Sequence, residues 1–159
     1  MAVIRDVVSS LAVQGFRRFL FLNGHGGNIA TVQAAFAELY ADASLAGQNS
    51  RLRLELFNWF QGARVGRLSR ELFGDAEGSH ATPSEISLTW YAYPEQVRHA
   101  PLEPERAPTG TIRDAAGYRE AFPDGRIGSN PALASVEHGQ RLYEAAVDDA
   151  MERWLAMTA

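Results

Sequence analysis

The sequence predicts an α/β fold built around a parallel sheet. Residues 16–22 are a short run dominated by Phe and Leu, which indicates a buried strand, and residues 29–40 place their apolar side chains on one face of a helix. Residues 51–60 then alternate apolar and polar side chains, as a second strand does. Strand, helix and strand in this order predict a right-handed parallel unit. At 159 residues, the chain has the length of one domain, residues 1–159.

Helices are predicted on both sides of this unit in the sequence. Apolar residues from Val3 onward recur at helical spacing, and Gly15 stands where a helix commonly ends. A short helix is expected at residues 64–73, and another after Thr82, while residues 94–108 and 109–128 are rich in proline, charge and glycine and are expected to be long surface connections.

The last predicted helix starts at Asn130 and Pro131. Gly139 is expected to weaken it midway, because glycine is a poor helix former. Its apolar residues form one stripe along the helix: Leu133, Val136, Tyr143, Val147, Ala150 and Trp154.

The net charge and the composition of the chain limit which partners and which metal ligands can be expected. The formal net charge of −4 provides no basic surface for nucleic acid or anionic lipid, so neither partner is expected. The chain has no cysteine, so any metal must bind through nitrogen and oxygen. Residues 1–10 resemble neither a signal peptide nor a membrane span, which leads us to expect a soluble, cytoplasmic protein.

The loop after the first strand is the first candidate for chemistry. It runs Asn23-Gly-His25-Gly26-Gly27-Asn28, at the end of a strand where open parallel sheets bind ligands. The imidazole of His25 suits zinc or manganese, glycines permit close approach, and Asn28 can cap the next helix. The alternative is a tight turn in which His25 only bonds a backbone carbonyl.

A second candidate combines a loop histidine, His80, with a carboxylate, Glu85, on the first turn of a helix. This pair could serve metal binding and proton transfer. Glu85 also has a structural interpretation, because Thr82-x-x-Glu85 is a capping box. Trp59, at the end of the second strand, could line a substrate pocket or simply belong to the core.

Together, the loop from Asn23 to Asn28 and the later His80-x-x-x-x-Glu85-x-Ser87 resemble the two signature blocks of the creatininase, or creatinine amidohydrolase, family. The resemblance extends to the glycine-rich run Gly125-Arg-Ile-Gly-Ser-Asn-Pro131 before the last helix. It implies a parallel-sheet fold with helices on both faces, a two-metal centre of zinc or manganese, and hydrolysis of a carbon–nitrogen amide bond. It also implies a small-molecule amide substrate and a cytoplasmic homo-oligomer.

Residue by residue, the resemblance implies that His25 and Glu85 ligate metal and that His80 passes a proton to the leaving nitrogen. Trp59 would face the substrate. The resemblance also places three loop residues in the substrate site: Gly26, Gly27 and Asn28.

The chain also departs from the family pattern. Relatives carry a Glu-x-His pair and a bridging aspartate upstream of the first block, whereas no Glu-x-His occurs between Met1 and Phe21. We therefore expect the chain to be a carboxyl-terminal portion of the fold. The missing ligands would then reflect truncation at the amino terminus, ligands supplied by another subunit, or a degenerate relative. Creatininase proper has a glutamate where this chain has Gly27, which argues against creatinine as the substrate. A small cyclic amide, a formamide or a peptide-like bond remains possible, as does an inactive binding or assembly module.

Overall fold

The computed structural model describes residues 1–159 and divides them into two compact units. The first unit comprises residues 1–62 and 148–159, and the second comprises residues 63–147. The expectation of one domain over residues 1–159 stays a prediction. No helix of the chain is both long enough and apolar enough to cross a membrane.

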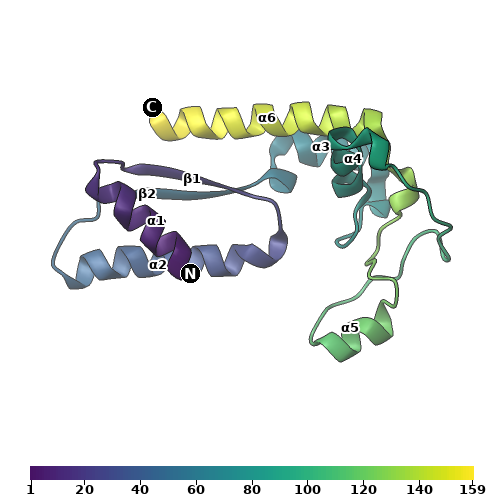
Figure 1. Cartoon of the computed structure of the whole chain (residues 1–159), viewed down its shortest axis with the longest axis horizontal. Coiled ribbons are helices and arrows are strands. Elements are labelled where there is room, and N and C mark those ends of the chain that lie inside the picture. Colours follow the sequence, from purple (N-terminus) through teal and green to yellow (C-terminus); the bar gives the residue numbers. More distant parts are fainter. The chain divides into compact units, whose positions relative to one another are not determined.

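The first unit contains the parallel α/β motif (Figure 1). Its two strands form a two-stranded parallel sheet whose register pairs Arg18 with Arg53 at one end and Asn23 with Asn58 at the other. The strand, helix and strand predicted from residues 16–60 are therefore confirmed. The elements of this part of the chain are α1 (Ala2–Val13), β1 (Arg18–Asn23), α2 (Ile29–Leu45) and β2 (Arg53–Asn58).

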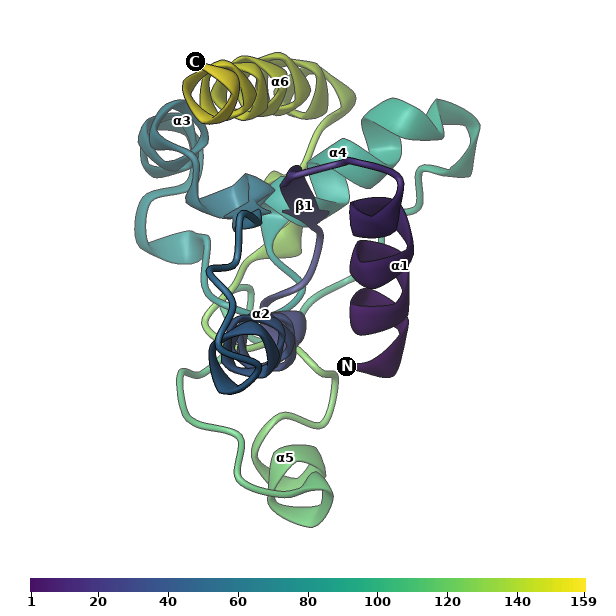
Figure 2. The same ribbon diagram turned by 90° about the vertical axis from the view of Figure 1, so that its left-hand side faces the viewer.

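One face of the sheet is covered by α1 and α2, whose apolar sides form the core of this unit. Figure 2 looks along the strands, with α2 below β1 and α1 beside it. The rings of Phe21 and Phe36 lie 5.1 Å apart between β1 and α2. Alternation along the strands explains the arrangement, because every second side chain points to this face. The buried members of the core are Val8, Val32, Phe36, Leu39 and Leu54.

The opposite face of the sheet carries the last turns of α6 (Val136–Thr158). Arg53 donates a hydrogen bond of 3.1 Å from its guanidinium to the carbonyl of Met157, and Arg153 pairs with Glu55 at 2.6 Å. Arg53 and Glu55 alternate with the leucines of β2, so they point away from α2. Helices thus lie on both faces, as the family resemblance implied.

The second unit is mainly helical, and two of its helices pack closely at a glycine. It contains α3 (Ala63–Phe73), α4 (Pro83–Ala92), α5 (Ala115–Ala121) and the first part of α6. A Cβ added to Gly139 of α6 would lie 2.0 Å from the carbonyl oxygen of Ser87 in α4. Gly139 is therefore not simply a weak point, because only glycine lets these helices approach so closely.

Two sequence expectations about this unit were wrong in detail. Residues 109–128 hold the helix α5, in which Asp114 accepts a hydrogen bond from the amide of Gly117 and so caps the first turn. The last helix begins at Val136, because Asn130 and Pro131 instead start a short 3-10 turn.

The apolar stripe expected along the last helix lies largely on its exposed side. Tyr143 is 51% exposed and Val147 is 40% exposed. The fully buried side chains of α6 are Leu142 and Met157.

Arg126 organises the long connection between α4 and α6. Its side chain is 4% exposed, and its guanidinium donates to the carbonyls of Glu105 at 2.8 Å and Pro104 at 2.9 Å while pairing with Asp124. These hydrogen bonds join two parts of the connection that are distant in sequence.

Candidate functional site

The loop after β1 is shaped by the side chain of Asn23, which is buried. Its Nδ2 donates to the carbonyl of His25 at 2.8 Å and to Oδ1 of Asn58 at 2.7 Å. Its Oδ1 accepts from the amide of His25 at 3.3 Å and from Nδ2 of Asn28 at 3.1 Å. The side chain of Asn23 therefore makes three hydrogen bonds within the loop and a fourth that joins the loop to the end of β2.

His25 lies at the start of the 3-10 turn Gly26–Asn28. Its backbone is extended, and its Nδ1 accepts a hydrogen bond of 3.2 Å from the amide of Gly27. The side chain thus caps the turn by accepting from an amide, rather than by bonding a backbone carbonyl. A Cβ on Gly27 would lie 2.8 Å from Cε1 of His25, so the ring occupies the space that a larger residue would need. In the neutral ring this cap places the proton on Nε2, which can donate to another partner.

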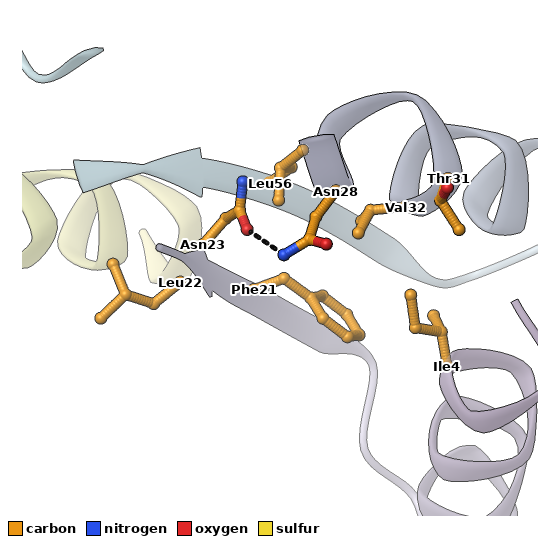
Figure 3. Close-up of a pocket in the computed structure, with 8 residues that line it drawn as sticks. All are labelled: Ile4, Phe21, Leu22, Asn23, Asn28, Thr31, Val32 and Leu56. Atoms are coloured by element: carbon orange, nitrogen blue, oxygen red, sulfur yellow. Dashed lines mark hydrogen bonds between the residues drawn. The ribbon is translucent and has the colours of Figure 1, made fainter. Parts of the chain in front are cut away.

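A pocket of 290 Å³ opens beside this loop (Figure 3). Among the predicted substrate residues, Asn28 lines it, whereas Gly26, Gly27 and Trp59 do not, and neither does the predicted metal ligand His25. The hydrogen bond between Asn23 and Asn28 runs along its polar side. The rest of the lining is mostly apolar: Ile4, Phe21, Leu22, Thr31, Val32 and Leu56.

Trp59 follows the last residue of β2 and lies in the 3-10 turn Trp59–Gln61. Because Asn58 pairs with Asn23, this turn and the His25 loop leave the sheet at the same edge. Trp59 packs edge-to-face on Phe60, with ring centroids 5.9 Å apart. Its contact with a substrate stays a prediction.

In the second unit, His80 is held by its backbone against the glycine-rich run before α6. His80 and Ile127 form an isolated antiparallel bridge, and the carbonyl of His80 accepts a hydrogen bond of 2.6 Å from Oγ of Ser129. Gly78 makes this contact possible, since a Cβ there would lie 2.4 Å from the carbonyl oxygen of Ile127. Two segments that resemble the family are thus packed on each other.

Glu85 forms the capping box expected from Thr82-x-x-Glu85. Its Oε2 accepts from the amide of Thr82 at 3.2 Å and from the hydroxyl at 2.9 Å, and its own amide donates to that hydroxyl. The structural interpretation of Glu85 is therefore confirmed, and its role as a metal ligand stays a prediction.

Glu77 is a further carboxylate beside Glu85, and it lies outside both signature blocks. Oγ of Ser84 donates to its Oε1, while its Oε2 is buried without a hydrogen-bond partner. Burial, assisted by the nearby charge of Glu85, raises the pKa of Glu77 above its ordinary value, although the hydrogen bonds from Ser84 and Thr82 oppose the rise. A Glu seven residues before a Ser in the first turn of a helix gave no recognisable sequence signal.

Glu77→Gln is expected to stabilise the protein at neutral pH more than at acidic pH. A carboxyl whose pKa is raised by folding contributes its full stability below the unfolded pKa and loses it as pH rises through the folded pKa. Melting temperatures of both proteins between pH 4 and pH 8 test this, and the advantage of the Gln variant should grow with pH. Glu95→Gln is the matched control at an exposed position and should show no such trend. A constant difference across the range would contradict the burial argument.

The chain does not by itself present the ligand set of a metal centre. A catalytic zinc usually has three protein ligands, and no group of three histidines, aspartates or glutamates that could hold a metal ion occurs in residues 1–159. His25 belongs to the first unit, and His80 and Glu85 belong to the second. Their convergence on one cationic centre stays a prediction.

Comparisons with known proteins support the fold. The chain is 28% identical over 140 residues to a mycofactocin precursor peptide peptidase of Mycobacterium ulcerans (strain Agy99), a match that spans 86% of this chain and 47% of the peptidase. A crystal structure of creatinine amidohydrolase gives a TM-score of 0.71 at 21% identity, covering 95% of this chain and 60% of that one. A manganese form and a mutant Zn–Zn form of creatininase each give 0.70 at 20% identity, over the same 95% and 60%.

The chain thus spans about half the length of the curated relative and three-fifths of the solved structures. The solved structures confirm the α/β fold. The family model of creatininase, described as creatinine amidohydrolase, matches residues 1–154. A match over nearly the whole chain shows that it belongs to the creatininase family.

Proposed function

We propose that this chain is part of a metal-dependent amidohydrolase that cleaves the carbon–nitrogen bond of a peptide-like amide. The family match over residues 1–154 carries the proposal, since it includes both the His25 loop and the His80–Glu85 segment. The structure supports it by giving each segment a defined conformation: a capped turn at the end of β1, and a histidine bridged to Ile127.

A peptide-like substrate is favoured over creatinine by two observations. Gly27 stands where creatininase proper has a glutamate, and the His25 ring fills the space beside it, so this loop offers no carboxylate at that position. The curated relative, moreover, is named as a peptidase of a precursor peptide. A small cyclic amide or a formamide is the competing substrate class within the same reaction type.

Each candidate residue has a role in this proposal. His25 and Glu85 supply metal ligands, completed by groups outside the two signature segments, and His80 gives a proton to the leaving nitrogen. Zinc and manganese are the proposed ions, in line with the forms of creatininase that share the fold. Trp59, Gly26, Gly27 and Asn28 contact the substrate. A cytoplasmic homo-oligomer is proposed on the same family grounds.

The proposal is tested by loading the purified chain with zinc or manganese and assaying peptides, cyclic amides and formamides. We expect hydrolysis that needs the metal and falls by about 100-fold or more in His25→Ala and in His80→Ala. His99→Ala is the matched control, because His99 only packs edge-to-face on Trp90, with ring centroids 5.1 Å apart. Circular dichroism confirms that each variant is folded. Protein that binds about two metal ions and hydrolyses no amide would contradict the proposal.

The competing function is a non-catalytic binding or assembly module derived from such an enzyme. It is motivated by the lack of three clustered metal ligands. Elemental analysis separates the two, because the module predicts a folded protein without stoichiometric metal, whereas the enzyme predicts about two ions for each complete site.

A further inference from the structure

Tyr118, on α5, lies against the ring of His80. The hydroxyl oxygen is 3.5 Å from Nδ1 of His80, and the two rings meet at 60° with centroids 5.8 Å apart. Both residues belong to the second unit. The seven-residue helix α5 therefore brings an aromatic hydroxyl to the histidine to which a proton-transfer role is assigned.

The direction of the hydrogen bonds follows from the partners of the hydroxyl. Tyr118 donates its proton to the carbonyl of Gly125 at 2.8 Å, and a carbonyl oxygen can only accept. A phenol has a single proton, so toward His80 the hydroxyl oxygen is left as an acceptor. Nδ1 of His80 must then carry the proton in this contact, which leaves Nε2 without one in the neutral ring.

We propose that Tyr118 is a positioning residue that holds His80 as the Nδ1–H tautomer and makes Nε2 its working nitrogen. The catalytic role of this tautomer of His80 rests on the proposed function. As the carbon–oxygen bond forms, Nε2 takes the proton lost by the attacking water, and Nδ1–H stays bonded to Tyr118. As the carbon–nitrogen bond breaks, Nε2 gives that proton to the leaving nitrogen, and the ring returns to its neutral form.

Tyr118 is itself held in place from several sides. Its ring packs on Phe122 at 5.8 Å, and its carbonyl accepts the amide of Phe122 at 2.8 Å. Gly125 has a φ of +82°, and a Cβ there would lie 3.2 Å from the Tyr118 hydroxyl. A hydroxyl fixed by a backbone carbonyl defines the ring orientation of His80 better than a mobile water would.

Two other histidines provide internal standards for the tautomer. Nδ1 of His138 lies 3.2 Å from the carbonyl of Leu133, so it must donate, and neutral His138 is the Nδ1–H form. Nδ1 of His25 accepts from the amide of Gly27, so neutral metal-free His25 is the Nε2–H form. The chain thus contains one reference for each tautomer.

The experiment is imidazole nitrogen NMR on the full, metal-free chain, at a pH where histidine is neutral. His80→Gln identifies the His80 signals. In the wild-type protein we expect His80 to match the Nδ1–H pattern of His138, and in Tyr118→Phe to move toward the Nε2–H pattern of His25. Tyr143→Phe is the matched control, because it removes a hydroxyl from a half-exposed tyrosine of the same unit and should leave all histidines unchanged.

A wild-type His80 in the Nε2–H form would overturn the proposal, and so would a Tyr118→Phe spectrum identical to that of the wild type. The wild-type spectrum decides even where the variant does not fold. With a hydrolysed amide in hand, Tyr118→Phe should lower kcat about 10-fold to 100-fold with KM unchanged, and a change confined to KM would count against positioning. Absence of amide hydrolysis by the wild-type protein would count against the proposed function and leave the tautomer result intact.

Discussion

Gly78→Ala is expected to lower the stability of the protein by about 3–4 kcal/mol and to displace the loop that carries His80. Gly78 has a φ of +65°, which costs about 1–2 kcal/mol for a residue with a Cβ. The new Cβ would also lie 2.4 Å from the carbonyl oxygen of Ile127 and from the amide of Ser129, both of them backbone atoms. The loop therefore has to leave the glycine-rich run, and the His80–Ile127 bridge opens with it.

The melting temperature measures the expected loss of stability, and the NMR signals of His80 report the expected displacement of its loop. The matched control is Gly74→Ala, since Gly74 also has a positive φ, +51°, but a Cβ there meets no atom within 4 Å. That variant should lose only about 1–2 kcal/mol of stability, which is the cost of the backbone strain alone. A loss in Gly78→Ala no larger than in Gly74→Ala would show that the loop tolerates the extra atom.

Gly139→Ala is expected to destabilise the second unit by about 2–3 kcal/mol. The added Cβ would lie 2.0 Å from the carbonyl oxygen and 2.6 Å from the carbonyl carbon of Ser87, so α6 and α4 must separate. Ser87 is fully buried and its hydroxyl accepts from the amide of Ser135, which means that the contact lies inside the unit. The higher helix propensity of alanine offsets at most about 1 kcal/mol of this loss.

Thermal unfolding followed by circular dichroism checks this prediction, with an expected decrease of about 5–10 °C. Gly66→Ala provides the comparison, because Gly66 also lies inside a helix and its Cβ would meet only the guanidinium of Arg70, at an ordinary 3.6 Å. We expect that variant to match or exceed the wild type in stability. An equal gain in both variants would mean that helix propensity, and not the approach of α4, governs position 139.

The elements that the sequence predicted well are those with a strong local signal. The alternation of residues 51–60 and the helical spacing of residues 29–40 follow directly from which faces β2 and α2 bury. The capping box at Thr82 and Glu85 depends on only four consecutive residues, and both of its hydrogen bonds are formed.

The features that escaped prediction depend on contacts between distant residues. Helix α5 has seven residues and a glycine in its first turns, so its periodicity is too short to distinguish it from a connection. The exposed side of α6 also carries large apolar side chains, which made Tyr143 and Val147 look like core positions. Propensity also disfavoured Gly139, which is explained by its close approach to Ser87 and Tyr91 of α4.

The sequence indicated which residue types form the candidate site, but not the hydrogen bonds and ring contacts that each of them makes. His25 and His80 could be chosen because imidazoles in glycine-rich loops are chemically suggestive. Their partners are set by tertiary structure: Gly27 donates to the ring of His25, and Tyr118, 38 positions after His80, meets its ring. Asn23 could be recognised as part of a motif. Its hydrogen bond to Asn58 could not be predicted, because it depends on the register of the two strands.

Arg126 forms a non-covalent cross-link in a chain that has no cysteine with which to form a disulfide. Its planar fork ties residue 126 to the carbonyl of Pro104, 22 positions earlier, and so closes a ring of backbone without a covalent bond. These hydrogen bonds exist only in the folded chain, so they restrict the folded connection but, unlike a disulfide, leave the unfolded chain unrestricted. A lysine would keep the charge and lose the fork, because a single ammonium does not replace the separate nitrogens that reach two carbonyls and a carboxylate.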